Sequence, residues 1–386
     1  MATDQQERIT VIDALRGFTL LGILIVHTYN LWGDFYVPES TSNLSVNLID
    51  TGISSFIGKF MSGKFHSIFT VLFGISFFIM LNRAETKGID FRFRFVWRMI
   101  ILIFIGCMHE LIYTWETLLS YGILGIPLIF FYKFKKRTIL ITAVCCLAIS
   151  SLYTPFYENI KDKLQPSRSS IETVVQIDEN SSSNETFKTF FADHLKHSTV
   201  KRLDYFFKHS EAFCLFGLFL LGLYLGKIKF FENTDQKKRL YQKIFWISIC
   251  IFCLFFCIQK LLYNSNYKTF SGISDDILDY SFTSAMVSIF ILLYSTRFRS
   301  LMDYLIPYGK MGLTNYIAQS VFGLVVFAPF CMGLNTQGLT VRIIIALMFY
   351  IVQIFVCTWH LKYFRYGPLE WFWRSATYLK RVPFLK

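Results

Sequence analysis

Long apolar runs recur along this chain, and they constrain its fold more than any other feature. Hydrophobic residues make up 54% of the 386 positions and aromatic residues 18%. Runs of about 20 apolar residues are long enough to cross a bilayer as helices, where every backbone polar group must be satisfied internally. The sequence therefore predicts an all-α membrane protein with about ten transmembrane helices. The expected spans are 15–33, 65–81, 95–113, 118–132, 138–155, 207–226, 244–263, 277–294, 311–332 and 339–361.

The net charge of +13 is concentrated in short loops between these runs. Lys and Arg follow the second, fourth, sixth, eighth and tenth spans, whereas the other short loops are nearly free of them. The positive-inside rule then places both termini in the cytoplasm and the protein, as a multi-pass protein, in a bacterial cytoplasmic (inner) membrane. The same distribution argues against nucleic acid as a partner. Residues 1–10 are polar and contain no signal peptide, so we expect the first span to be retained.

Composition divides the chain into three parts. Residues 1–156 form an N-terminal membrane half with spans one to five, and residues 207–386 form a C-terminal half with spans six to ten and a basic cytoplasmic tail. Residues 157–206 are polar and are expected outside the cytoplasm. In the tail, Pro368, Glu370 and Arg374 indicate a helix lying at the membrane surface.

The first span carries three ionisable residues that a lipid-facing helix would avoid. Arg16 and His27 are eleven positions apart, which returns to within about 20° of the same helix face, and Asp13 lies close to that face. A purely structural interpretation is possible. In it, Asp13 caps the helix, Arg16 anchors it at the interface and His27 hydrogen-bonds to a neighbouring helix. Ionisable groups at membrane depth more often mark a functional site. Arg16 suits an anionic group, and His27 suits proton transfer near neutral pH.

The predicted topology brings further polar residues to the outer half of the first four spans. His66 begins the second span, His109 and Glu110 end the third, and Glu116 lies in the following turn. An interfacial turn would explain them structurally, whereas a carboxylate orienting an imidazole would explain them chemically.

Two other groups have weaker functional implications. Asn315 and Gln319 share one face of the ninth span, where interhelical hydrogen bonding is the simplest role. Cys250, Cys253 and Cys257 share a face of the seventh span with no His or carboxylate beside them, so we expect no metal site.

The sequence Asp-Ala-Leu-Arg-Gly at 13–17, followed by His27, resembles the opening helix of transmembrane acyltransferases. That superfamily includes acyltransferase-3 O-acetyltransferases of surface polysaccharides and the heparan-α-glucosaminide N-acetyltransferase. Within it, the chain looks most like the YeiB-like bacterial membrane proteins. The supporting residues are Lys64, Phe65, Phe73, Gly74, Gly106, His109, Trp115, Glu116, Tyr121, 313–316, Gln319, 367–371 and Arg374.

The resemblance implies acyl transfer that depends on Arg16 and His27. It implies acyl-CoA, most simply acetyl-CoA, as co-substrate, with Arg16 and Asp13 on the donor side and no metal. Catalytic roles would fall to His27, His109 and Glu116, although the pattern favours Asp at position 116.

The acceptor would be an envelope glycan, lipid or peptide, with His66, Asn315 and Gln319 as candidate substrate-binding residues. A transporter or flippase for a small amphiphile is the alternative, but the chain shows no internal repeat that would favour it. A non-catalytic scaffold would leave His27 unexplained. The sequence leaves homo-oligomerisation open.

Overall fold

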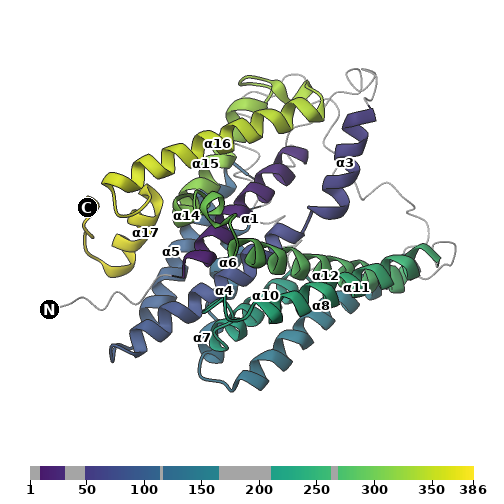
Figure 1. The fold of residues 1–386 in the computed structure, drawn as a ribbon, viewed down its shortest axis with the longest axis horizontal. Coiled ribbons are helices and arrows are strands. Elements are labelled where there is room, and N and C mark those ends of the chain that lie inside the picture. Colours follow the sequence, from purple (N-terminus) through teal and green to yellow (C-terminus); the bar gives the residue numbers. More distant parts are fainter. Residues whose placement is uncertain (1–8, 31–47, 114–115, 165–209, 262–267) are drawn as a thin grey trace.

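The computed structural model describes residues 9–30, 48–113, 116–164, 210–261 and 268–386, with side chains throughout except at 154–164 and 268–271. Within these residues the fold is all-helical, as the sequence predicts, and the β-structure there consists of one isolated bridge between Phe364 and Leu385 (Figure 1). The helices are α1 (Thr10–Tyr29), α3 (Leu48–Phe60), α4 (Lys64–Glu85), α5 (Arg92–Glu110), α6 (Leu118–Gly125), α7 (Leu128–Phe131), α8 (Lys136–Leu164), α10 (Glu211–Lys227), α11 (Lys238–Leu261), α12 (Lys268–Tyr294), α13 (Arg299–Met302), α14 (Leu305–Lys310), α15 (Gly312–Phe327), η2 (Leu334–Thr336), α16 (Leu339–Tyr363) and α17 (Pro368–Tyr378).

The structure supports a multi-pass membrane protein. Six described segments are long and apolar enough to cross a bilayer: Thr10–Tyr29, Leu48–Glu85, Lys136–Tyr153, Lys238–Leu261, Gly272–Tyr294 and Leu339–Tyr363. The other four predicted spans correspond to α5, α6 with α7, α10 and α15, which are shorter or more charged. The count of ten and the cytoplasmic position of the termini stay predictions.

Two predicted spans differ from the observed helices because of proline. The fourth is divided into α6 and α7 at Pro127, which has no N–H to continue the helical hydrogen bonds. The ninth ends at Phe327 because Ala328, which precedes Pro329, is extended (φ −64°, ψ 136°). The fifth extends beyond its predicted end, since α8 continues to Leu164. Most of the predicted outer segment 157–206 lies outside the described residues.

Helix α1 lies at the centre of the molecule, in contact with α4, α12, α14, α15 and α16 (Figure 1). Two glycines allow its close contact with α14. A Cβ added to Gly17 would lie 2.5 Å from the carbonyl oxygen of Leu305, and one added to Gly309 would collide with the carbonyl of Asp13. Since residues from both halves of the sequence surround α1, the core is continuous across the central polar segment.

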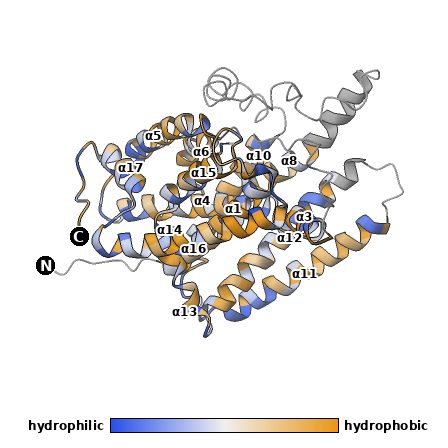
Figure 2. Cartoon of the chain, turned by 90° about the horizontal axis from the view of Figure 1, so that it is seen from above, coloured by the Kyte–Doolittle hydropathy of each residue, from blue (hydrophilic) through white to orange (hydrophobic). Residues whose placement is uncertain are grey.

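The outer helices present apolar side chains away from this core. Trp246 and Leu254 of α11 and Phe355 of α16 are exposed, and both helices are strongly hydrophobic in Figure 2. Such surfaces suit contact with lipid tails, which agrees with the bilayer as a partner.

Several basic helix ends meet at one side of the molecule. We call this side, which carries Arg83, Arg94, Lys310 and Arg374, the basic end. The Tyr294 hydroxyl at the end of α12 donates to Thr10 Oγ1 at the start of α1 (3.0 Å). The Trp97 indole near the start of α5 donates to the carbonyl oxygen of Ala376 in α17 (3.0 Å). This grouping is the arrangement that the positive-inside rule requires, whichever side of the membrane it faces.

Candidate functional site

A cavity of about 640 Å³ opens at the basic end and runs inward beside α1. Helices α4, α5, α6, α14, α15, α16 and α17 complete its wall. Cationic side chains line much of it, namely Arg16, Arg83, Lys87, Arg94, Arg98, Lys310, Arg365 and Arg374, against the carboxylates of Asp13 and Glu370. The volume suits a cofactor-sized ligand, and the charge suits an anionic one.

Arg16 is held in the wall of this cavity by three neighbours. Its Nη1 donates to Asp13 Oδ1 (3.0 Å) and more weakly to the carbonyl oxygen of Gly309 (3.5 Å), while Nη2 donates to Ser76 Oγ (2.9 Å). Asp13 is buried, so its carboxylate orients the guanidinium. The sequence placed Asp13 on the donor side as well, and Asp13 both lines the cavity and accepts from Arg16.

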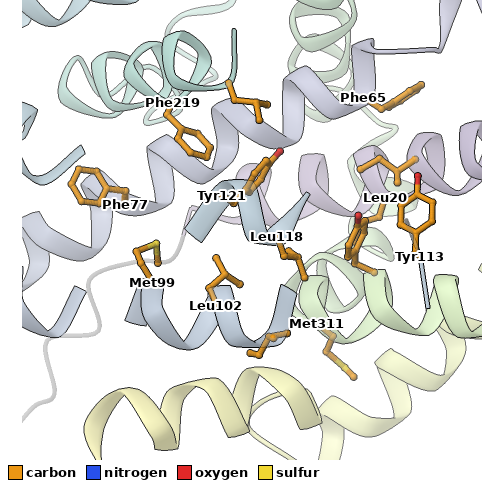
Figure 3. Packing of buried hydrophobic residues seen from close by; sticks show 14 of the residues in the cluster. Leu20, Phe65, Phe77, Met99, Leu102, Tyr113, Leu118, Tyr121, Phe219 and Met311 are labelled. Carbon is orange, nitrogen blue, oxygen red and sulfur yellow. The ribbon is translucent and has the colours of Figure 1, made fainter. Parts of the chain in front are cut away.

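The inner end of the cavity is closed by side chains from α6 and α15. Leu118, Tyr121 and Tyr316 line it there. Figure 3 shows Leu118 and Tyr121 among side chains that include Phe219 and, from α5, Met99 and Leu102. The Tyr121 hydroxyl shares a hydrogen bond with Thr70 Oγ1 (2.5 Å). The ring of Tyr316 therefore forms part of the boundary between the cavity and the residues beyond it.

Beyond this boundary lie the histidines that the sequence predicts to converge. The ring centroid of Tyr316 is 5.3 Å from that of His109 and 6.2 Å from that of His27, and the centroid of Tyr113 is 4.8 Å from that of His27. His66 lies on the neighbouring helix, with its ring centroid 5.9 Å from that of Tyr121. His27 is near enough to both other histidines for electrostatic interaction.

Glu116 joins His109 to the start of α6. Its Oε2 pairs with His109 Nδ1, and its Oε1 accepts from the backbone N–H of Leu118. Both side chains are buried, with His109 2% and Glu116 0% exposed. Glu110 is buried as well, but the carboxylate that pairs with His109 is Glu116. An imidazole fixed by a carboxylate at Nδ1 presents Nε2 for proton transfer, and Nε2 of His109 has no hydrogen-bond partner among the described residues.

Asn315 and Gln319 make interhelical hydrogen bonds in this structure. Asn315 Nδ2 donates to the carbonyl oxygen of Tyr308 (2.9 Å) and to Cys357 Sγ (3.2 Å). Gln319 Nε2 donates to the carbonyl oxygen of Leu20 (3.1 Å) and to the Tyr308 hydroxyl (2.8 Å). Neither side chain lines the cavity, so these contacts support the structural role rather than substrate binding.

The contribution of α17 to the cavity wall is what sequence reasoning missed. The guanidinium carbon of Arg98 lies 3.5 Å from the ring centroid of Trp373, and that of Arg374 lies 4.5 Å from the ring centroid of Tyr366. Glu370 is half-buried against the start of α15, where its carboxylate accepts from the N–H groups of Leu313 and Thr314. The sequence predicts a helix at the membrane surface here, which stays a prediction; it does not predict that this helix packs on α5 and α15.

The part of the chain that the structure describes holds no cluster of three or more His, Cys, Asp or Glu suited to a metal ion. Cys250, Cys253 and Cys257 are exposed on α11, where lipid tails would surround them.

Comparison with known proteins matches the chain to a family model and to two uncharacterized proteins. Residues 225–380 match the family described as "Protein of unknown function (DUF418)". Two Bacillus proteins are similar over nearly the whole chain: "Uncharacterized protein YxaH" of Bacillus subtilis (strain 168) is 27% identical, and the "Uncharacterized 39.9 kDa protein in amylase 3'region" of Bacillus acidopullulyticus is 26% identical. Each alignment covers 98% of this chain and 96% of the relative. No solved structure matches. The chain is thus similar to this family over residues 225–380 and to two uncharacterized Bacillus proteins over nearly its whole length.

Proposed function

We propose that this protein is a membrane-embedded acyltransferase that moves an acyl group from acyl-CoA to an envelope glycan, lipid or peptide. Acetyl-CoA is the simplest donor, and the bacterial cytoplasmic membrane is the proposed location. The observation that carries the proposal is the cavity, which begins at a ring of cations and ends at Tyr316, against which His27 and His109 pack. A phosphate-rich donor and a proton-transfer group would thus meet at one boundary.

The donor's phosphates would bind at the basic end. Arginine pairs well with phosphate because its planar fork donates two parallel hydrogen bonds. Arg16, Arg98 and Arg374 line the cavity from three different helices, so they can surround one ligand. The thioester would then extend inward toward Leu118 and Tyr316.

The transfer step needs a base close to the acceptor. Its hydroxyl or amine would attack the thioester carbonyl carbon while an imidazole takes the proton; the carbon–sulfur bond then breaks, and the departing CoA sulfur receives that proton. The sequence suggested His27 as the base or as a transient acyl carrier. The pairing of His109 with Glu116 gives His109 the same capacity, since a carboxylate at Nδ1 stabilises the imidazolium. We assign proton transfer to His27 and His109.

The test is acyl-CoA binding and CoA release by the purified full-length protein, with envelope material as the acceptor. We expect Arg16→Ala to weaken acetyl-CoA binding and His27→Ala and His109→Ala to reduce CoA release without weakening binding. Arg239→Ala, which removes a cation outside the cavity lining, is the matched control for charge. If none of the three site variants changes binding or release, the acyltransferase proposal fails. Movement of a solute without CoA release would favour the transporter alternative.

A further inference from the structure

A second cavity, of about 630 Å³, lies on the side of α1 away from the histidines. Its inner wall comes from Phe18 of α1, Met286 and Phe290 of α12, Leu305 of α14 and Ile354 of α16. Every lining side chain is apolar or aromatic, and the Tyr304 hydroxyl is the polar group among them. Such a cavity suits a hydrocarbon chain and offers nothing to a charged ligand.

The mouth of this cavity opens sideways, onto the surface that faces the bilayer. Five of its lining residues are exposed, namely Ile289, Leu301, Tyr304, Ile351 and Phe355. Two of them belong to α16, and Ile289 belongs to α12, both of which are long and apolar enough to span the membrane. A ligand can therefore reach the cavity from the lipid phase without passing through water.

The cavity also lies near the headgroup level of one leaflet. Its wall at α13 is preceded in the sequence by the turn after α12, where Arg297 and Phe298 are exposed, and the exposed Arg299 begins α13. The guanidinium carbon of Arg299 lies 5.3 Å from the ring centroid of Tyr294, whose hydroxyl is within hydrogen-bond distance of Asp303 Oδ1 (2.9 Å) and of Thr10 Oγ1 (3.0 Å). Figure 2 places α13 at the margin of the molecule. Arginine beside aromatic residues is typical of the membrane interface.

We propose that this cavity binds one acyl chain of an anionic phospholipid, whose phosphate lies against Arg297 and Arg299. Residues 295–303 carry Arg297 and Arg299 against one carboxylate, that of Asp303, so the turn has a net positive charge. Basic side chains at this level attract anionic headgroups, whereas a zwitterionic headgroup adds a cation that the two arginines repel. The site is independent of the proposed acyl transfer, because it shares neither Arg16 nor the histidines.

The test uses the purified full-length protein in detergent, titrated with phosphatidylglycerol or phosphatidylcholine of the same chain length and followed by native mass spectrometry. We expect phosphatidylglycerol to bind roughly tenfold more tightly, as two interfacial arginines would give. Arg297→Gln with Arg299→Gln should remove most of that preference while retaining weak binding of both lipids. Ile354→Trp should fill the cavity and abolish binding, whereas Leu254→Trp, on the exposed face of α11, should leave it unchanged.

A second measurement avoids dependence on the folding of the Ile354→Trp variant. Tyr304→Trp places a fluorophore in the cavity wall, and phosphatidylglycerol with brominated chains should quench the added fluorescence more strongly than brominated phosphatidylcholine at equal mole fraction. Glycerol 3-phosphate, which has the headgroup chemistry without the chain, should not displace the lipid. Equal binding or equal quenching by the two lipids, or full preference retained in the double arginine variant, overturns the proposal.

Discussion

The carboxylate of Glu116 contacts a backbone N–H through one oxygen and the His109 imidazole through the other. One carboxylate oxygen accepts from the N–H of Leu118, where α6 begins and backbone donors lack helical partners. The other oxygen faces His109 Nδ1. The sequence predicted that Glu116 and His109 would lie together, because a short turn joins their helices. It could not predict which carboxylate would pair with the imidazole, since the exact path of the turn decides between Glu110 and Glu116.

Glu116→Gln tests this pairing. The amide cannot stabilise a protonated His109, so we expect the rate of acyl transfer to fall roughly a hundredfold, with acyl-CoA affinity retained. Glu116→Asp, the residue that the family resemblance favours, should keep most of the rate. The measurement is single-turnover CoA release at saturating acyl-CoA. Equal rates for Glu116→Gln and the original protein would contradict a role in proton transfer.

At the scale of elements, α1 is positioned by close backbone contacts that no hydropathy pattern contains. The sequence located α1 and its polar face, because Arg16 and His27 stand out in an apolar run. It did not indicate that α14 would press against α1 through Gly17 and Gly309, or that α17 would pack on α5 and complete the cavity. Those contacts join residues about 290 positions apart, and local periodicity carries no information about them.

Gly309→Ala tests the contact between α1 and α14. The added Cβ would collide with the Asp13 carbonyl, so α14 must move away from α1 and from Arg16. We expect a loss of roughly 1–3 kcal/mol in stability and weaker acyl-CoA binding. Thermal unfolding in detergent and equilibrium binding measure the two effects. Gly52→Ala, where the added Cβ meets open space, is the control. An unchanged melting temperature for Gly309→Ala would show that the helices are not so closely packed.

We expect Glu370 to make the stability of the contact between α17 and α15 depend on pH. Its carboxylate accepts from the N–H groups of Leu313 (2.7 Å) and Thr314 (3.0 Å), yet burial raises its pKa above the ordinary 4.5. A raised pKa in the folded state means that folding favours the protonated carboxyl. The stability from Glu370 is therefore fully present below its ordinary pKa and is lost as pH rises through the folded value.

Glu370→Gln removes this titration. The melting temperature of the original protein, relative to that of the variant, should decrease as the pH is raised from the ordinary pKa of Glu370 through its folded-state value. A difference in melting temperature that is constant with pH would show that the carboxyl of Glu370 has the same pKa in the folded and unfolded states.

For the whole molecule, hydropathy predicted the helical class and the approximate limits of most helices, because apolar run length is dictated by the bilayer. Loop charges also predicted which helix ends lie together. Neither hydropathy nor loop charge predicts how the helices pack. The cavity depends on that packing, because side chains from distant helices must leave the space unfilled. The direction of the molecule in the membrane, which the loop charges predict, decides which compartment reaches the cavity.

Reporter fusions test that direction. A green fluorescent protein attached after Lys386 should fluoresce, because we expect the C-terminus in the cytoplasm. An alkaline phosphatase reporter inserted within residues 157–206 should be active, because that segment is expected outside. The opposite pair of results would place the basic end and its cavity outside the cytoplasm, where acyl-CoA is not found.

Transfer of a labelled acyl group across the membrane tests the central claim most directly. Inside-out vesicles containing the protein would receive labelled acetyl-CoA on their cytoplasmic face, and label in envelope material within the lumen would be measured. We predict that the original protein transfers label while His27→Ala and Arg16→Ala do not. Equal lumenal label with His27→Ala, or no lumenal label with the active, correctly oriented protein, would contradict an acyl-transfer path along α1.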